Sequence, residues 1–292
     1  MNAREALLTG RLDGQSDLVL CSAAVVLNGE TFTPDEVIAF LDFRLCYSFP
    51  AGRSVYGVGL MPQVVANSYR SLKYKSVNLN HVMRILDTEN KAHDTIKGQV
   101  VAVEFPAPPE NGGWANMPLN ADPASAPGIH GIAALDKRAE RIDKIIGGHL
   151  SNKQEYTVSI EYPLRLGNAG ILVKGTGPEA HRTTPAPLLT QGYSYYPVLG
   201  EHQAPDDLFE CWNRDANGPG RGAIVKDWVG QQVTLLPGGL DGAVTFHGLA
   251  IVKLGAEPPA RIDAIAAGVE NNLSALRKAN AVVAFALNQL KL

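Results

Sequence analysis

The chain has few cysteines and few charges, and each shortage argues against a class of protein. Its three cysteines, Cys21, Cys46 and Cys211, lie far apart among 292 residues and form no CxxC pair. This spacing disfavours a thiolate metal site and a disulfide framework, and it suits a reducing cytosol. Charged residues make up 19% of the chain and the formal net charge is −3. Neither value is typical of a nucleic-acid binder or of an acidic disordered tail, so no nucleic-acid partner is expected.

Long apolar runs and grouped metal ligands are also missing. No stretch approaches the roughly 18 apolar residues of a membrane span, and residues 1–15 lack a run of the signal-peptide type. We therefore expect a soluble protein with no membrane partner that is not exported by that route. The seven histidines form no HExxH or HxH pattern and nothing resembles GxSxG. A zinc site and a hydrolase of the nucleophile-elbow type are therefore poorly supported.

The chain is 45% hydrophobic, which is enough for a real core, and its apolar residues are divided among short elements. Strand-like runs occupy residues 18–30, 97–106, 155–163, 223–236 and 242–254. Helices are predicted over 33–45, where Thr33, Pro34 and Glu36 form a start signal, over 61–72, and over 131–152 with Gly147 and Gly148 as the stop. Apolar residues from Ile262 to Leu276 fit a helical tail. The expected fold is α+β, with a β-rich core, flanking helices and this tail.

The strand predicted at 155–163, EYTVSIEYP, carries its polar residues on one face and its apolar residues on the other. Apolar side chains alternate with Thr157, Ser159 and Glu161, so a hydroxyl and a carboxylate two residues apart share one side. A solvated face of an antiparallel strand has the same pattern. Serine becomes a nucleophile only with a base in reach, and the segment KSVNLNHVMRILD offers His81 as a candidate.

Four stretches follow one another along the chain: VNLNH around His81, IKGQVVAVE, GIAALDKRAERID and YTVSIEY around Ser159. Their order and spacing resemble those of the prohead maturation proteases of tailed bacteriophages, relatives of the herpesvirus assembly proteases. The resemblance spans roughly residues 18–262, with HGLAIVKLGAEPPARI as the closing stretch. It implies a protease-like domain over 18–262 with a β-barrel-like core of mostly antiparallel strands, between an N-terminal extension, 1–17, and a C-terminal helical tail, 263–292.

The resemblance also implies an activity. Ser159 would be the nucleophile and His81 the general base of a serine endopeptidase that needs no cofactor or metal. Its substrates would be the scaffold, the major capsid protein and the enzyme itself. It would work as a homo-oligomer inside assembling proheads in the host cytoplasm.

The third catalytic residue is open on the sequence alone. Glu161 shares the face of Ser159, and Cβ atoms two residues apart on a strand lie roughly 6.5–7 Å from each other. His181 is the alternative, because the herpesvirus relatives place a second histidine downstream, and Arg182 beside it is a candidate for oxyanion support. A polar turn is the favoured explanation of His181 and Arg182. His93 and Glu104 are further candidates.

A Pro/Gly-rich loop at 106–128, with Trp114 as a docking anchor, is either a flap over the substrate groove or a surface insertion. Two other functions fit the same sequence. One is a non-catalytic capsid-assembly or scaffold relative. The other is a β domain that binds a small ligand, in which Ser159 is merely polar.

Overall fold

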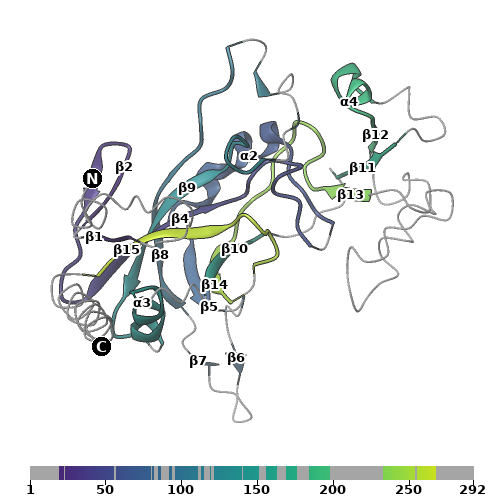
Figure 1. The fold of residues 1–292 in the computed structure, drawn as a ribbon. Helices are drawn as coiled ribbons and strands as arrows, with labels where there is room; N and C mark the ends of the chain where they lie inside the picture. The colour runs from purple at the N-terminus through teal and green to yellow at the C-terminus, as the bar shows by residue number, and fades with distance from the viewer. Residues whose placement is uncertain are drawn as a thin grey trace, which may run out of the picture.

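A computed structural model gives the fold of most of the chain. It describes residues 20–22, 24–55, 57–79, 81, 85–86, 92–93, 96–110, 113–114, 119, 122–139, 141–150, 156–162, 169–175, 184–197, 233–253 and 255–267. Figure 1 shows a large sheet that curls into a half-barrel, with few helices around it. The fold is therefore α+β and rich in strands, as the sequence predicted.

The large sheet has eight strands. In spatial order they are β1 (Leu20–Ser22), β15 (Arg261–Ala266), β4 (Ile38–Leu45), β9 (Ile129–Asp136), β8 (Ile96–Glu104), β5 (Ser76–Leu79), β14 (Gly248–Val252) and β10 (Thr157–Glu161). The β1–β15 and β14–β5 pairs are parallel, and the other neighbours are antiparallel. The expectation of mostly antiparallel strands is confirmed.

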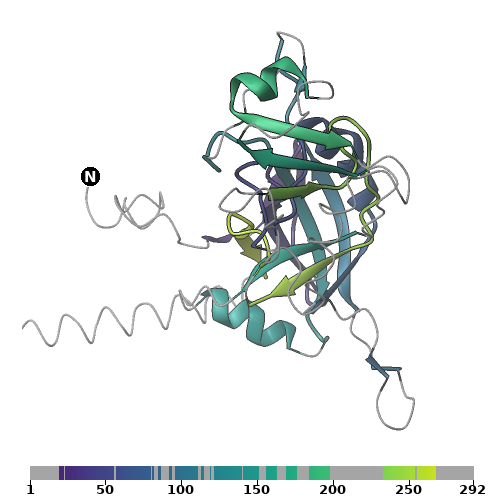
Figure 2. The same ribbon diagram turned by 90° about the vertical axis from the view of Figure 1, so that its right-hand side faces the viewer.

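Smaller elements surround this sheet. A second sheet contains β12 (Tyr193–Pro197), β11 (Gly170–Lys174) and β13 (Val233–Leu236), and two hairpins pair β2 (Val25–Leu27) with β3 (Glu30–Phe32) and β6 (Ile85–Leu86) with β7 (Ala92–His93). The helical segments are α2 (Pro62–Ser68), η1 (Tyr69–Leu72), α3 (Ile142–Leu150) and α4 (Ala186–Thr190). Figure 2 shows the second sheet and α4 at one end of the large sheet and α3 at the other. None of the helices in the described ranges is long and apolar enough to cross a membrane.

The core packs against one face of the large sheet, because every second side chain along its strands points to that face. In β4, every second side chain from Ala39 to Leu45 is fully buried. Val77, Val100, Leu135, Val158, Leu249 and Ile251 from other strands belong to the same cluster. Each large side chain of this kind stabilises the fold by about 1.5–3 kcal/mol through burial.

The helix predicted over 33–45 is wrong, because residues 38–45 form β4. The Thr33-Pro34 signal belongs to a turn in which the Asp35 carboxylate accepts hydrogen bonds from the N–H groups of Val37 and Ile38, at 2.7 Å each. The side chains beyond that turn alternate with a period of two, which matches a strand and not a helix.

Two other helices were predicted in part wrongly. Residues 131–136 belong to β9, so the helix starts only at Ile142, and it passes through Gly147 and Gly148 to Leu150. At the chain's far end, residues 261–266 form β15 inside the large sheet, where a helix was expected from Ile262. The rest of the expected helical tail, and the N-terminal extension 1–17, lie outside the described residues.

Other predictions are confirmed. Residues 62–72 are helical, 96–104 are a strand, and the strand at 155–163 is present as β10. The run at 18–30 splits into several short strands, and its Asn28-Gly29 turn joins β2 to β3 with both φ angles positive, at 52° and 78°.

Residues 46–60 connect the two sheets. The Gly59 N–H donates to the Leu235 carbonyl at 2.9 Å, and the Leu235 N–H donates to the Gly57 carbonyl at 2.8 Å. The Arg53 guanidinium adds a 2.8 Å hydrogen bond to the Val233 carbonyl. This segment leaves β4 and lies between the sheets, where it becomes one wall of a pocket.

Candidate active site

Strand β10 places Ser159 and Glu161 on one face, as strand alternation predicted. Val158 is fully buried in the core, whereas Ser159 and Glu161 line a pocket, and Ile160 both lines this pocket and packs against the core cluster. Ser159 retains 7% of its exposure and the Glu161 side chain 13%. The simple alternative of a fully solvated polar face therefore does not describe this strand.

Strand β14 lies between β10, which carries Ser159, and β5, which leads to His81. It pairs antiparallel with β10 and parallel with β5, and Ala250 lies opposite both Ser159 and Asn78. His81 follows β5 by two residues, at a point where the backbone has the left-handed φ of 60°. Left-handed backbone in a residue other than glycine is uncommon, and it turns His81 toward β10.

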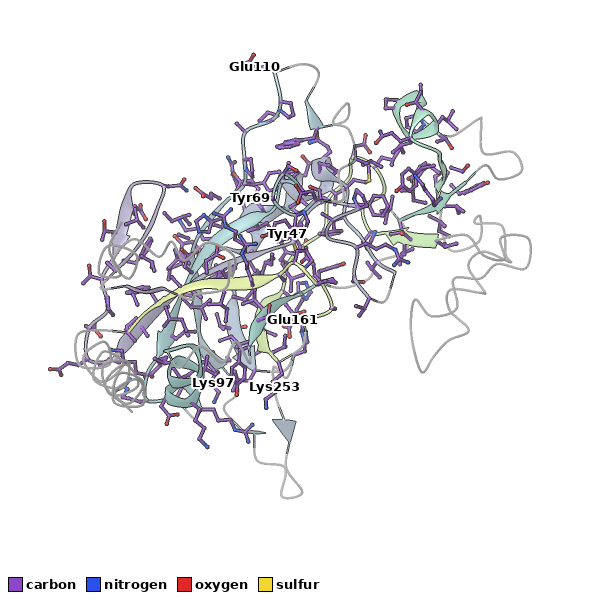
Figure 3. All side chains as sticks on the ribbon, in the orientation of Figure 1. Tyr47, Tyr69, Lys97, Glu110, Glu161 and Lys253 are labelled. Atoms are coloured by element: carbon purple, nitrogen blue, oxygen red, sulfur yellow. The ribbon has the colours of Figure 1, made fainter. Side chains whose placement is uncertain are left out.

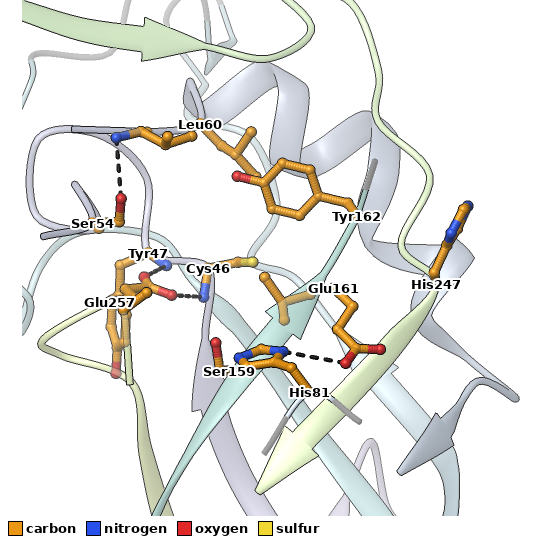
Figure 4. Close-up of a pocket in the computed structure, with 15 residues that line it drawn as sticks. Cys46, Tyr47, Ser54, Leu60, His81, Ser159, Glu161, Tyr162, His247 and Glu257 are labelled. Carbon is orange, nitrogen blue, oxygen red and sulfur yellow. Dashed lines mark hydrogen bonds and ion pairs between the residues drawn. The ribbon is translucent and has the colours of Figure 1, made fainter. Parts of the chain in front are cut away.

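The imidazole of His81 contacts the Glu161 carboxylate. Its Nδ1 lies 3.2 Å from Glu161 Oε1, and Figure 4 shows the Ser159 hydroxyl on the other side of the ring. If Nδ1 carries the proton, it donates to Glu161, and Nε2 is left with a lone pair for a serine proton. The structure therefore brings the predicted Ser159, His81 and Glu161 together.

Two neighbours hold the Glu161 carboxylate in place. Asn78 is fully buried, and its Nδ2 donates to Glu161 Oε1 at 3.1 Å and to Oε2 at 3.2 Å. Gly248 lies opposite Glu161 across the strand pair, and a Cβ there would approach Oε2 to 2.5 Å. The sequence showed Asn78 only as part of the VNLNH motif; its contact with Glu161 depends on the register of three strands.

The pocket beside these residues has a volume of about 570 Å³. Four consecutive residues from Ser159 to Tyr162 form one side, and the 46–60 segment with Ala256 and Glu257 forms the other (Figure 4). Val58, Leu60, Ile160 and Tyr162 make much of its lining apolar. The cavity therefore joins a polar cluster to a space suited to uncharged groups.

Cys46 is another side chain in the pocket with nucleophilic chemistry. Burial, and then the nearby Glu257, raises the pKa of the Cys46 thiol well above its ordinary value of 9.0. A protonated thiol is a poor nucleophile. Ser159, which has a histidine beside it, is the better candidate.

Glu257 is a site residue that sequence reasoning missed. Its carboxylate accepts hydrogen bonds from the N–H groups of Cys46 and Tyr47, at 2.7 Å and 2.5 Å. Burial raises its pKa to about 8 despite these two hydrogen bonds, which lower it. No local signal in GAEPPAR marks the residue, because its partners lie about 210 positions earlier.

The remaining candidates are elsewhere. Glu104 hydrogen-bonds His130 on β9, away from the pocket lining. His93 is in β7, and its side chain is outside the described part of the structure, as are His181 and Arg182. Arg182 as oxyanion support and His181 as the third catalytic residue therefore stay predictions.

The anchor predicted in the 106–128 loop is present. Trp114 is 7% exposed and packs on Phe105 with ring centroids 5.1 Å apart. Figure 3 shows Glu110 of this loop far from Glu161, and none of the loop's described residues lines the pocket. The described part of the loop therefore does not form a flap over this pocket.

The described residues contain no cluster of three histidine, cysteine or acidic side chains that could hold a metal ion. Comparisons of the chain with protein-family models, with curated proteins and with solved structures found no match.

Proposed function

We propose that this chain is a serine endopeptidase with Ser159 as nucleophile, His81 as general base and Glu161 as the third member. The observation that carries the proposal is the 3.2 Å contact between His81 Nδ1 and Glu161 Oε1, made beside Ser159 on the same strand face. Nucleophile, base and a carboxylate that orients the base are the parts that acyl transfer requires.

The chemistry follows from these positions. His81 Nε2 takes the hydroxyl proton as Ser159 Oγ attacks a peptide carbonyl, and the imidazolium then donates that proton to the leaving amine. Glu161 stabilises the imidazolium and keeps its Nδ1 proton in place. Asn78, by donating to both carboxylate oxygens, fixes the orientation of the Glu161 side chain.

The position of β10 at the edge of the large sheet supports a polypeptide substrate. Among the described strands, β10 pairs with β14 alone, and its residues 159–161 line the pocket. Edge strands recognise extended peptides by main-chain hydrogen bonds, with alternate side chains entering pockets. An unfolded or flexible protein segment is therefore the substrate proposed here.

The role in phage head maturation rests on the resemblance of the motifs around His81 and Ser159. Within that role the substrates are scaffold and capsid-protein segments and the chain itself, and the enzyme works as a homo-oligomer in assembling proheads. Neither a cofactor nor a metal is part of the proposal, because the side chains of Ser159, His81 and Glu161 are sufficient for the proton transfers.

A fluorophosphonate probe tests the activity directly. We expect a single adduct on Ser159 in the parent chain and none in Ser159→Ala or His81→Ala, all three with similar circular dichroism. Intact mass after storage provides the second readout, with self-trimming in the parent only. Absence of both labelling and trimming in a folded parent chain would reject the peptidase and favour a non-catalytic assembly protein with the same fold.

A further inference from the structure

Glu257 links the start of the 46–60 segment to the turn before β15. Its Oε2 accepts the Cys46 N–H and its Oε1 accepts the Tyr47 N–H. Both donors lie immediately after β4, whereas Glu257 lies in the turn before β15. The carboxylate therefore fixes the first residues of the 46–60 segment at the position where this segment begins to line the pocket.

The backbone beside Glu257 has little freedom to adjust. Cys46 has a left-handed φ of 51°, a conformation that non-glycine residues adopt at a cost and only when surrounding contacts impose it. The backbone at Gly52 lies close to Tyr47 and Glu257. A Cβ at Gly52 would lie 1.6 Å from the Tyr47 carbonyl oxygen and 2.7 Å from Glu257 Oε1. The segment is thus wrapped around the carboxylate.

The turn that carries Glu257 also contacts the strand of the nucleophile. The Val55 N–H donates to the Ala256 carbonyl at 2.8 Å, which adds a second link to the 46–60 segment. On the other side, the Thr157 hydroxyl donates to the Ala260 carbonyl. Residues 256–260 therefore set the separation between β10 and the opposite wall of the pocket.

We propose that Glu257 is a positioning residue that fixes the pocket wall facing Ser159 and so determines how tightly a peptide segment is held beside the nucleophile. The inference rests on the proposed function for its substrate and on the hydrogen bonds of Glu257 for its mechanism. Glu257 contacts no member of the Ser159, His81 and Glu161 set by hydrogen bond in the described residues, so its loss affects binding and leaves the proton transfers intact.

The proposal has a pH signature. The titratable groups that face Glu257 are Cys46 and Tyr47 after β4 and Tyr162 after β10, and all three are neutral near pH 7. Because burial raises the pKa of Glu257 from 4.5 to about 8, its contribution to stability is fully present below pH 4.5 and is lost as pH rises through 8. Glu257→Gln removes this titration and one of the two acceptors.

Hydrogen exchange and thermal unfolding test the inference without any substrate. At pH 9, above the pKa of Glu257, both of its carboxylate oxygens accept hydrogen bonds, and we expect the amides of residues 46–47 to exchange at least fivefold faster in Glu257→Gln than in the parent chain. The Tm of the parent should fall relative to Glu257→Gln between pH 4.5 and 8. Glu30→Gln, an exposed change on β3, serves as control and should match the parent. Unchanged exchange at residues 46–47 would overturn the inference whether or not the chain is a peptidase.

Cleavage of fluorescein-labelled casein then separates binding from chemistry. Glu257→Gln should raise KM at least fivefold and keep kcat within twofold, whereas His81→Ala should abolish kcat. A Glu257→Gln enzyme with normal KM and low kcat would show that Glu257 belongs to the chemistry and would refute the positioning role. If no variant and no parent cleaves casein or accepts the fluorophosphonate, the proposed function fails, and the exchange data still decide the role of Glu257.

Discussion

The Glu161 carboxylate contacts His81 and Asn78, and it occupies space that a Cβ at Gly248 would need. This arrangement leaves the carboxylate little room to move, so small changes beside it should alter activity more than stability. Two substitutions separate the contributions of space and of hydrogen bonding.

Gly248→Ala tests whether the Glu161 carboxylate needs the free space beside Gly248. The new methyl group would approach Glu161 Oε2 to 2.5 Å, and the carboxylate must turn away because the strand backbone cannot. We expect kcat to fall at least tenfold, with a Tm within a few degrees of the parent. Gly147→Ala is the matched control, since nothing lies within 4 Å of a Cβ at that helical position. A fully active Gly248→Ala enzyme would show that Glu161 does not need its present position.

Asn78→Ala tests the hydrogen bonds. A hydrogen bond to a charged group contributes about 1.5–3 kcal/mol, so the loss of both donors should reduce kcat by about tenfold to a hundredfold. Fluorophosphonate labelling of Ser159, followed as a rate, measures the effect without a substrate. A labelling rate equal to that of the parent chain would remove Asn78 from the mechanism.

At the scale of single elements, β10, which carries Ser159, could be predicted from the sequence. Strand β4, which precedes the 46–60 segment, could not. The polar face of β10 follows from local alternation, which needs no tertiary information. The start signal at Thr33 and Pro34 is local too, but the turn and strand that follow use the same residue types. Asp35 completes a turn there, and the period-two burial of Leu41 and Phe43 identifies the strand.

The roles of Asn78 and Glu257 could not be found in this way. Asn78 meets Glu161 only because β14 sets the register of two other strands at Ala250. Glu257 meets Cys46 across 211 positions of sequence. Both contacts are consequences of strand order, which one sequence does not reveal.

Strands β4, β8 and β9 share a second polar group. His130 Nδ1 lies 2.7 Å from Glu104 Oε1, and Nε2 lies 2.7 Å from Asp42 Oδ1. Both ring nitrogens can donate only when the imidazole is protonated. Burial alone lowers the pKa of His130, but the hydrogen bonds to Asp42 and Glu104 outweigh it and raise the pKa above 6.5.

This histidine should make stability depend on pH. A raised pKa in the folded state means that its stabilisation is fully present below pH 6.5 and is lost as pH rises through the folded pKa. We expect His130→Gln to lower the free energy of unfolding by about 1–3 kcal/mol at pH 5.5 and by clearly less at pH 9. Urea unfolding at both pH values measures the difference. An equal loss at both values would contradict protonation of His130 in the folded protein.

At the scale of the whole molecule, the large sheet depends on its last two strands. β14 lies between β5 and β10, and β15 lies between β1 and β4. A chain that ends at Phe246 therefore lacks both, and we expect it to show no cooperative unfolding transition and no fluorophosphonate labelling. Labelling of Ser159 in that shortened chain would mean that the site forms without β14.

Because Ala250 separates the strand of Ser159 from the strand that leads to His81, the site has a fixed place in the order of synthesis. A ribosome that has made residues 1–246 has produced Ser159, His81 and Glu161, yet nothing holds them together. Under the proposed function, these three residues can act together only after residues 248–252 have left the ribosome and entered the sheet as β14. Self-cleavage during synthesis would then be excluded until β14 has been made.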